Sequence, residues 1–203
     1  ATKLQLAFIP VGGRISHGTA TTMASKAGEG GCIRRNGRIT RQPLGHSGKW
    51  LTVQNKRMFV MSIPWGDIST AFITTGIPDI ITYTGMRPMV YRLLKFQFLY
   101  NWLLRTSQVR KALQKRIDQA PAGPTDAERN KARTYIFGSV TNQKGESRSM
   151  WIQTADGYTV TVEACLLIAA KVLQGQYKPG YQTPAGCYGS KLVFELPGTQ
   201  QLK

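Results

Sequence analysis

An α+β fold built as one domain, residues 1–203, is predicted by three features of the sequence. The chain has 203 residues, of which 41% are hydrophobic, enough to bury a single core. Four tryptophans and several long apolar runs argue against a disordered chain. Short apolar runs of strand length are interspersed with stretches of helical periodicity, so both kinds of element are expected.

The centre of the fold is expected at residues 58–86. Residues 58–63 are apolar and partly β-branched, and Pro64 ends this strand because proline donates no ladder hydrogen bond. Asp67 has the short acceptor side chain of a helix N-cap, and a helical pattern follows it. Residues 79–84 resemble a second strand. Strand, helix and strand in so short a run predict a compact βαβ-type unit.

The start of the chain predicts a strand and a helix. Residues 3–10 form the opening strand, and the small residues of 20–27 favour a helix that Ser16 or Thr19 caps. The clustered amides at such a helix start also favour a carboxylate or a phosphate. A structural cap is the more common role of these residues.

Residues 32–43 predict a tight hairpin, because Asn36-Gly37 favours a two-residue turn. Its arms carry four arginines, which fit a solvated basic edge that discourages aggregation: Arg34, Arg35, Arg38 and Arg41. A DNA-reading ribbon would need a recognition pattern that this segment lacks. Residues 49–55 add another strand that leads into the central unit.

A long helix is predicted for residues 89–117. Its first half is apolar on most of its circumference, and its second half narrows to one apolar face. No acidic residue occurs between Arg87 and Arg116. Because Arg92 and Lys95 interrupt the apolar run, a membrane-spanning helix is not expected. Packing between elements or subunits is favoured, and a position in a membrane interface stays open beside it.

The C-terminal part predicts a hairpin and a second helix. Residues 118–133 contain prolines, a glycine and charges, and predict a surface connection. Residues 134–141 and 147–154 are strands joined by a turn. Residues 158–173 have the length and the apolar spacing of a helix. Two further segments complete the chain, a rigid loop and an apolar run: residues 178–186 and 192–196.

Net charge is the unusual total, because 27 Lys and Arg face 10 Asp and Glu and give a formal +17. Such a balance attracts any polyanion, whether nucleic acid, an acidic membrane face or a phosphorylated cofactor. Three cysteines without close pair spacing predict neither a disulfide framework nor a zinc site, so a reducing cytoplasm is the expected location. Residues 1–13 lack the basic segment and long apolar core of a signal peptide.

Several classes of enzyme site have no counterpart in the sequence. No G-x-G-x-x-G joins a strand to a helix, and neither a P-loop lysine motif nor a G-x-S-x-G elbow occurs. The two histidines are far apart and the acids are scattered, so neither a Ser-His-Asp group nor a metal site is predicted. The residues alone therefore indicate a basic, soluble α+β domain.

Five blocks of sequence stand out by their order and spacing: Ser16-x-Gly-Thr19, Ile63-Pro-Trp-Gly-Asp67, Thr74-Thr-Gly-Ile-Pro78, Gly157-Tyr158 before an alanine-rich helix, and Pro179-Gly-Tyr-Gln-Thr-Pro-Ala185. Together they resemble the saccharopine dehydrogenase-like oxidoreductases, a family that includes the trans-acting enoyl reductases of lipid biosynthesis. The blocks extend over residues 16–198, and their combination is more specific than any one of them.

The resemblance implies a two-part enzyme. In that family a Rossmann half binds NAD(P), and a second α+β half, a mixed sheet covered by helices, shapes the substrate cleft and often the subunit contact. This chain resembles only the second half, so a fragment with one long helix and no Rossmann domain is expected. NAD or NADP is expected for the full-length enzyme and none for these residues alone, which makes independent catalysis unexpected. The expected partners are the N-terminal Rossmann domain and a second copy of the chain.

The blocks also indicate which residues face substrate or cofactor. They are Ser16, Gly18, Thr19, Trp65, Asp67, Thr74, Thr75, Gln182 and Thr183. Asp67 is a weak candidate for an acid or base, with capping of its own helix as the favoured alternative, and no settled catalytic residue follows from the resemblance. Contact with an anionic substrate or membrane is expected from four cations: Arg87, Arg92, Lys95 and Arg105.

Two functions from different classes are compatible with the sequence. The first is the substrate-binding and oligomerisation domain of an NAD(P)-dependent oxidoreductase, with acyl or enoyl substrates. The second is a basic module that binds an anionic membrane surface or nucleic acid without sequence specificity, which the charge of +17 favours. Specific nucleic-acid recognition is not expected, because neither a stacking motif nor a zinc finger accompanies the charge. Peripheral membrane contact through residues 89–117 stays open for a cytoplasmic protein.

Overall fold

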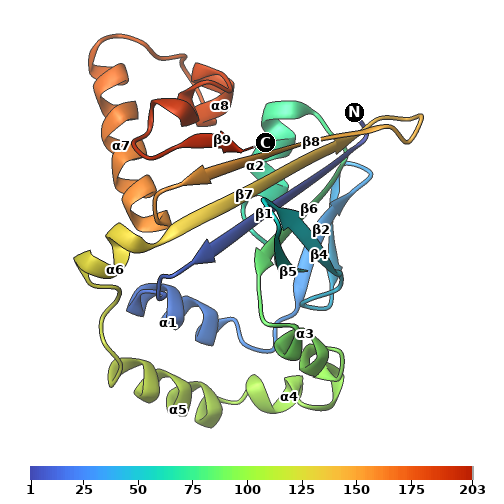
Figure 1. Ribbon diagram of the computed structural model, residues 1–203. Helices are drawn as coiled ribbons and strands as arrows, with labels where there is room; N and C mark the ends of the chain where they lie inside the picture. The colour runs from blue at the N-terminus through green and yellow to red at the C-terminus, as the bar shows by residue number, and fades with distance from the viewer. Residues whose placement is uncertain (203) are drawn as a thin grey trace.

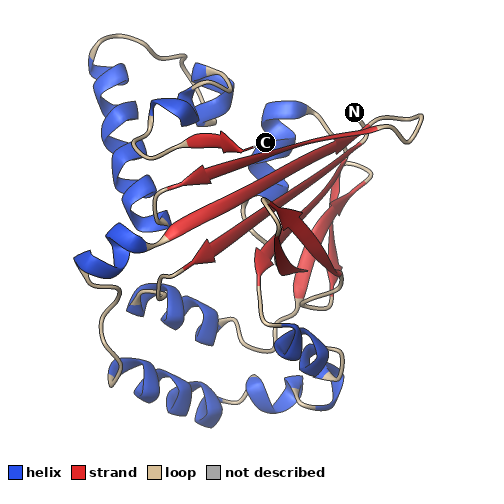
Figure 2. Ribbon diagram, in the orientation of Figure 1, coloured by secondary structure: helices blue, strands red, loops and turns tan. Residues whose placement is uncertain are grey.

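The computed structural model describes residues 1–202 and contains one mixed β-sheet with helices at its edges and on one face (Figure 1). The long strands fan diagonally across the molecule, as the colouring by element in Figure 2 makes plain. Within the described residues the strands are β1 (Lys3–Val11), β2 (Gly31–Arg35), β3 (Arg38–Gln42), β4 (Gly48–Val53), β5 (Lys56–Ser62), β6 (Asp79–Gly85), β7 (Arg133–Thr141), β8 (Ser147–Thr154) and β9 (Gln200–Leu202).

Helices accompany this sheet along the whole chain, which confirms the predicted α+β class. Over the same described part they are α1 (His17–Ser25), α2 (Asp67–Thr75), α3 (Pro88–Leu94), η1 (Gln97–Leu99), α4 (Asn101–Leu104), α5 (Ser107–Asp118), α6 (Asp126–Lys131), α7 (Gly157–Leu173), α8 (Pro184–Tyr188) and η2 (Leu192–Glu195). In Figure 1, α1, α3, α4 and α5 lie below the sheet and α7 lies to its left.

The strand order is β3-β2-β6-β1-β7-β8-β9. The same edge of β6 pairs with β2 at Ile80 and with β5 further along, at residues 83–85. In the described residues β1 and β6 are the one parallel pair, and the other strands pair antiparallel. The predicted βαβ unit is therefore wrong. Met61 lies opposite Thr84, so α2 joins two antiparallel neighbours, and the parallel partner of β6 is the opening strand.

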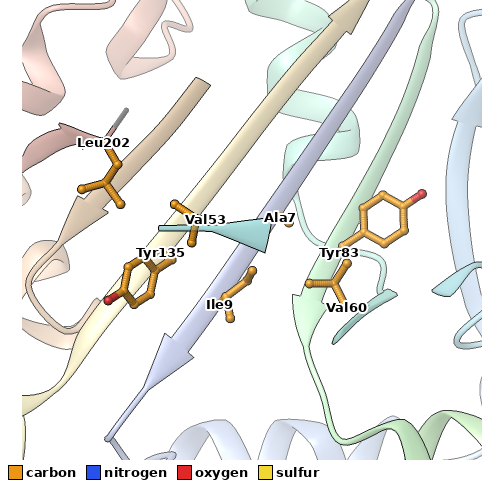
Figure 3. Packing of buried hydrophobic residues seen from close by; sticks show 7 residues of the cluster. All are labelled: Ala7, Ile9, Val53, Val60, Tyr83, Tyr135 and Leu202. Atoms are coloured by element: carbon orange, nitrogen blue, oxygen red, sulfur yellow. The ribbon is translucent and has the colours of Figure 1, made fainter. Parts of the chain in front are cut away.

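One face of the sheet is covered by the β4–β5 hairpin, which crosses it as Figure 3 shows. Successive side chains of a strand point to opposite faces, so Ala7 and Ile9 of β1 face this hairpin while Leu6 and Phe8 face the other way. The buried cluster under the hairpin contains Ala7, Ile9, Val53, Val60, Tyr83, Tyr135 and Leu202.

The other face is covered by α2. Ala71 and Phe72 of this helix pack against a buried group formed by Leu4, Ile77 and Ile80. Gly76 ends the helix with a left-handed φ of 67°, a conformation that costs glycine little. The helix thus packs on the inner strands β6 and β1 of the sheet, on the face opposite the β4–β5 hairpin.

The predicted basic hairpin is confirmed as β2 and β3, with Asn36 and Gly37 at positive φ in its turn. The solvated role of Arg34 is wrong. Its guanidinium lies 4.1 Å from the centre of the Phe72 ring, and its Nε donates to the Ile68 carbonyl oxygen at 2.6 Å. Arg34 therefore joins the hairpin to α2. Its strand, β2, lies inside the sheet between β3 and β6, so its side chain can reach the helix that covers this face.

The long helix predicted for residues 89–117 is wrong, because the chain forms α3, η1, α4 and α5 in succession. After α3, the Gln97 side chain donates to the carbonyl oxygens of Leu94 (2.7 Å) and Leu44 (2.8 Å) and accepts from the Leu44 N–H (3.2 Å). Before α5, Thr106 adopts an extended conformation. The tertiary hydrogen bonds of Gln97 here override helix propensity.

The C-terminal predictions are confirmed more closely. β7 and β8 form the predicted hairpin, and α7 is the helix predicted for residues 158–173. Residues 118–133 contain a short helix, α6, which Thr125 and Glu128 start with a reciprocal capping box. The apolar run at residues 192–196 is the 3₁₀ helix η2, and it leads to β9 at the sheet edge.

Candidate substrate-facing site

Two strands that leave the sheet at the same edge bring the first predicted residues together. β1 and β8 both run antiparallel to β7, so the starts of α1 and α7 lie at one edge. There the Tyr158 hydroxyl oxygen accepts from the Ser16 N–H at 2.6 Å and lies 3.3 Å from Oγ1 of Thr19. Ser16 Oγ accepts from the Thr19 N–H and caps α1, as predicted. We call Ser16, Thr19 and Tyr158 the hydroxyl cluster.

Tyr158 is the member of this cluster that the sequence did not single out. It stands in the Gly157-Tyr158 block, which was the available signal. Burial raises the pKa of Tyr158, but the hydrogen bonds from Ser16 and Thr19 together outweigh that effect and lower the pKa below its ordinary value. A phenol whose pKa is lowered in this way is better suited to giving up a proton near neutral pH.

A second pair of predicted residues joins α2 to α8. Oγ1 of Thr74 lies 2.7 Å from Oγ1 of Thr183. The Thr74 hydroxyl donates to the Thr70 carbonyl oxygen at 2.9 Å, so the bond between the two threonines is donated by Thr183. Thr183 Oγ1 in turn accepts from the Gly186 N–H and caps α8. Both hydroxyls are thus engaged within the chain and hold the two helices together.

Trp65 stands beside a row of apolar side chains on the face that carries α2. Its ring meets Phe8 edge-on, with centroids 6.4 Å apart and an interplanar angle of 73°. Phe8 lies opposite Ile136, and Ile136 lies opposite Ile152, so the three form a cross-strand row over β1, β7 and β8. All three are half-buried, because α2 packs near the other end of these strands. We call them the apolar row.

Asp67 does not cap its helix, which corrects the favoured alternative for this residue. Gly66 is already helical and takes the N-cap position, so Asp67 is the first helical residue and no side-chain cap forms. Burial raises the pKa of the Asp67 carboxyl group, and a hydrogen bond from its own backbone N–H opposes that effect. The Asp67 carboxyl group is thus half-buried, at the start of the helix that follows Trp65 in the chain.

Replacing Asp67 by Asn is expected to remove one component of the pH dependence of stability, the component that falls as the pH rises. A carboxyl group whose folded pKa is raised binds more protons in the folded state than in the unfolded state. Its contribution to stability is therefore lost as the pH rises from the unfolded pKa of about 3.9 through the raised folded value. Urea unfolding across acidic pH measures this slope. Asp126→Asn is the matched control, because Asp126 also begins a helix but is exposed. Equal slopes in both variants would contradict the prediction.

The remaining predicted residues have local roles. The Thr75 hydroxyl donates to the Ala71 carbonyl oxygen at 2.6 Å and accepts from the Ile77 N–H at 3.3 Å, so it helps to end α2. Gln182 is exposed and bonds to the Pro179 carbonyl oxygen within its loop. Gly18 lies in the first turn of α1 with open space around its Cα. Within residues 1–202, no hydrogen bond links the hydroxyl cluster to the Thr74–Thr183 pair.

The four cations predicted for anion contact all lie on α3, α4 or their flanks, away from these residues. Each side chain is exposed. Lys95 donates to the His46 carbonyl oxygen at 3.4 Å, and Arg105 donates to the Gly28 carbonyl oxygen at 2.8 Å. Arg87 occupies the N-cap position of α3, and Arg92 lies in the last turn of that helix. The cations therefore belong to a separate surface of the protein.

The described residues do not fit a dinucleotide cradle. A Rossmann site needs a run of parallel strands with a glycine-rich turn into a helix, whereas this sheet has a single parallel pair in residues 1–202. The helix start after β1 is also engaged internally. The Ser16 N–H donates to Tyr158, the His17 N–H to the Ala122 carbonyl oxygen and the Thr19 N–H to Ser16. The favoured interpretation of this helix start, a structural cap, is therefore confirmed, and these three amides bond within the protein rather than to an anion.

Residues 1–202 contain no group of three His, Cys, Asp or Glu side chains arranged to hold a metal ion. No helix among them is both long enough and apolar enough to cross a bilayer. A hollow of about 210 Å³ is lined by Gly45, His46, Lys95, Gln97 and Phe98 among others, and none of the predicted substrate-facing residues lines it.

Comparison with known proteins gives a structural likeness and no sequence match. No protein-family model matches the chain, and no curated protein does. Among solved structures, the fold is similar to that of the apo form of histidine-tagged saccharopine dehydrogenase (L-Glu forming) from Saccharomyces cerevisiae. That alignment has a TM-score of 0.49 at 9% sequence identity and covers 100% of this chain and 67% of that one. A likeness at this level assigns neither a family nor an activity.

Proposed function

We propose that this chain is the substrate-binding and assembly domain of an NAD(P)-dependent oxidoreductase of the saccharopine dehydrogenase-like kind. The observation that carries the proposal is the meeting of sequence blocks that lie far apart in the chain. The Ser16 block bonds to Tyr158 of the alanine-rich helix, and the Thr74 block bonds to Thr183 of the proline-rich loop. Blocks that share a family resemblance and also contact one another support one common architecture.

An acyl or enoyl chain is the proposed substrate class. The apolar row and the exposed edge of Trp65 offer a hydrophobic surface on one face of the sheet. Polar groups follow it in the chain, with Asp67 two residues after Trp65 and the hydroxyl cluster after the ends of β1 and β8. An apolar lining with a few polar groups is the usual composition of a small-molecule site. Tyr158 would hydrogen-bond the polar head of the substrate, and the row would hold its chain.

The outer face of α7 is proposed to contact the dinucleotide-binding half. Its exposed residues carry no charge: Tyr158, Thr161, Val162, Cys165, Leu166, Ala169, Ala170, Val172 and Leu173. Leu173 exposes 88% of its surface, and a helical stripe of this kind is typical of an interface. Because the stripe begins at Tyr158, a domain seated on it would lie next to the hydroxyl cluster. A second copy of this chain is the alternative occupant.

The proposal is tested by supplying the dinucleotide-binding half. We expect the chain, combined with or fused to such a domain, to oxidise NAD(P)H in the presence of enoyl or keto acyl compounds, and neither part to do so alone. Absorbance of the reduced nicotinamide follows the reaction. A folded combination that binds NAD(P)H but leaves a broad panel of these compounds unreduced would overturn the proposal.

Within that assembled enzyme, Tyr158→Phe is expected to lower kcat about tenfold, the equivalent of one lost hydrogen bond in the transition state. The loss should be larger than any change in KM, and the pH profile of kcat should lose its upper limb if the phenol exchanges a proton. Tyr181→Phe, at an exposed position outside the hydroxyl cluster, is the matched control. Unchanged kcat and pH profile in Tyr158→Phe would exclude a catalytic role for this hydroxyl group.

A further inference from the structure

The segment from α3 to α4 exposes an unusual amount of apolar surface. Phe98 exposes 72% of its surface and Trp102 67%, so neither is a core residue that merely shows an edge. Single exposed apolar residues are common, but a cluster of them marks a contact surface. We call the following eight exposed residues the apolar patch: Met89, Val90, Leu93, Phe96, Phe98, Leu99, Trp102 and Leu103.

The inner side of the same segment is fixed to the rest of the protein. The Tyr91 ring packs against Phe59 with centroids 5.1 Å apart. Gly48 makes room for both rings, because a Cβ at this position would lie 2.7 Å from Tyr91 and 2.8 Å from Phe59. The buried Gln97 side chain bonds to the backbone of Leu44. The apolar patch is therefore presented outward by an anchored segment.

Two aromatic side chains in or beside the patch carry hydrogen-bond donors, and both donors bond to backbone carbonyl oxygens of patch residues. The Trp102 indole N–H donates to the Leu99 carbonyl oxygen at 2.9 Å, and the Tyr100 hydroxyl donates to the Leu93 carbonyl oxygen at 2.9 Å. An unpaired donor makes transfer into an apolar medium costly. Because these donors keep their partners, both rings can leave water without losing hydrogen bonds.

Positive charge surrounds the patch. Arg87, Arg92, Lys95 and Arg105 are all exposed, and no acidic residue lies between Arg87 and Arg116. Lys95 and His46 also line the hollow of about 210 Å³ beside Phe98, which offers room and a cation for an anionic group. An apolar centre with a cationic margin matches the interface of a bilayer that contains anionic lipid.

We propose that the apolar patch and its four cations dock the protein on the surface of an anionic phospholipid bilayer. The apolar side chains would enter the interface and the cations would meet the headgroup phosphates. A symmetric contact with a second copy would bring like charges face to face. Five of the eight patch residues are aliphatic, whereas single-stranded nucleic acid stacks on aromatic rings. This inference is independent of the proposed oxidoreductase function.

Vesicle co-sedimentation of the full chain tests the proposal. We expect binding to vesicles of phosphatidylcholine with phosphatidylserine, weaker binding at high salt, and weak binding to phosphatidylcholine alone. Phe96→Ser combined with Phe98→Ser should lower the partition coefficient by at least about tenfold, because each ring leaves the interface. Ile39→Ser combined with Ile73→Ser, at exposed positions of β3 and α2, is the control and should bind as the native chain does.

The cations have their own matched pair of variants. Arg87→Gln with Arg92→Gln should lower binding to anionic vesicles about twenty-fivefold, at roughly fivefold for each charge. Arg38→Gln with Arg41→Gln removes the same net charge from exposed positions of β3 and should have a much smaller effect. Circular dichroism of each variant confirms that it is folded.

Three outcomes would overturn the proposal. One is that no anionic vesicle binds the chain at low salt. Another is that both cation pairs weaken binding equally, which would show that net charge alone acts. The third is that the phenylalanine variants leave vesicle binding unchanged but abolish binding to a single-stranded oligonucleotide or abolish a dimer seen by light scattering. That result would assign the patch to nucleic acid or to a second copy.

Discussion

Ile80→Ala is expected to lower the free energy of unfolding by about 2–5 kcal/mol. This is the usual loss when a buried aliphatic side chain is truncated to alanine and leaves a cavity. Ile80 exposes 1% of its surface and belongs to β6, which pairs with β1, β2 and β5. Its neighbours Leu4 and Ile77 are themselves buried, and Phe72 is held by the Arg34 guanidinium. These neighbours have little freedom to fill the space. Urea unfolding at fixed pH measures the loss.

The same chemical change at Ile73 is the control for this prediction. Ile73 lies on α2 and exposes 58% of its surface. Ile73→Ala should change stability by less than about 0.5 kcal/mol, since little burial is lost and alanine favours a helix. Similar losses in the two variants would show that β6 is not the structural centre of the sheet.

The elements near Ile80 illustrate what sequence patterns could predict. Pro64, Gly76 and the β-branched runs act through local backbone rules, so the two strands and the helix at residues 58–86 were predicted where they lie. Their pairing was not. The parallel partner of β6 is the opening strand, 76 residues earlier in the register of Lys3 with Asp79. No local pattern encodes such a choice, because it depends on packing among distant segments.

The candidate site divides in a similar way. Ser16 and Thr19 were predicted from capping rules and the family resemblance, and the structure joins them to Tyr158. The link between Thr74 and Thr183 is a contact between two blocks that the resemblance named separately. The cap assigned to Asp67 was wrong by one position, because Gly66 already adopts helical angles. Propensity rules do not locate a helix start to within one residue, so they could not distinguish Gly66 from Asp67 as the N-cap.

Gln97→Leu is expected to lower the free energy of unfolding of the α3–α4 segment by about 2–3 kcal/mol, because it leaves three part-buried backbone groups without the partner that Gln97 provides. Those groups are the Leu44 N–H and the carbonyl oxygens of Leu44 and Leu94. Leucine is close to glutamine in size, so the loss of hydrogen bonds dominates. Amide hydrogen exchange should show faster exchange in α3, η1 and α4 than in the native chain.

Gln108→Leu is the control that separates the loss of the Gln97 hydrogen bonds from the general effect of replacing a helical glutamine by leucine. Gln108 is also a helical glutamine, but its side chain is exposed and bonds only to Ser107. We expect its exchange pattern to match that of the native chain. If Gln97→Leu accelerated exchange in β6 as much as in α3, the segment would unfold together with the sheet. Faster exchange confined to α3, η1 and α4 would instead show that this one side chain, bonded to a loop 53 residues earlier, holds the segment in place independently of the sheet.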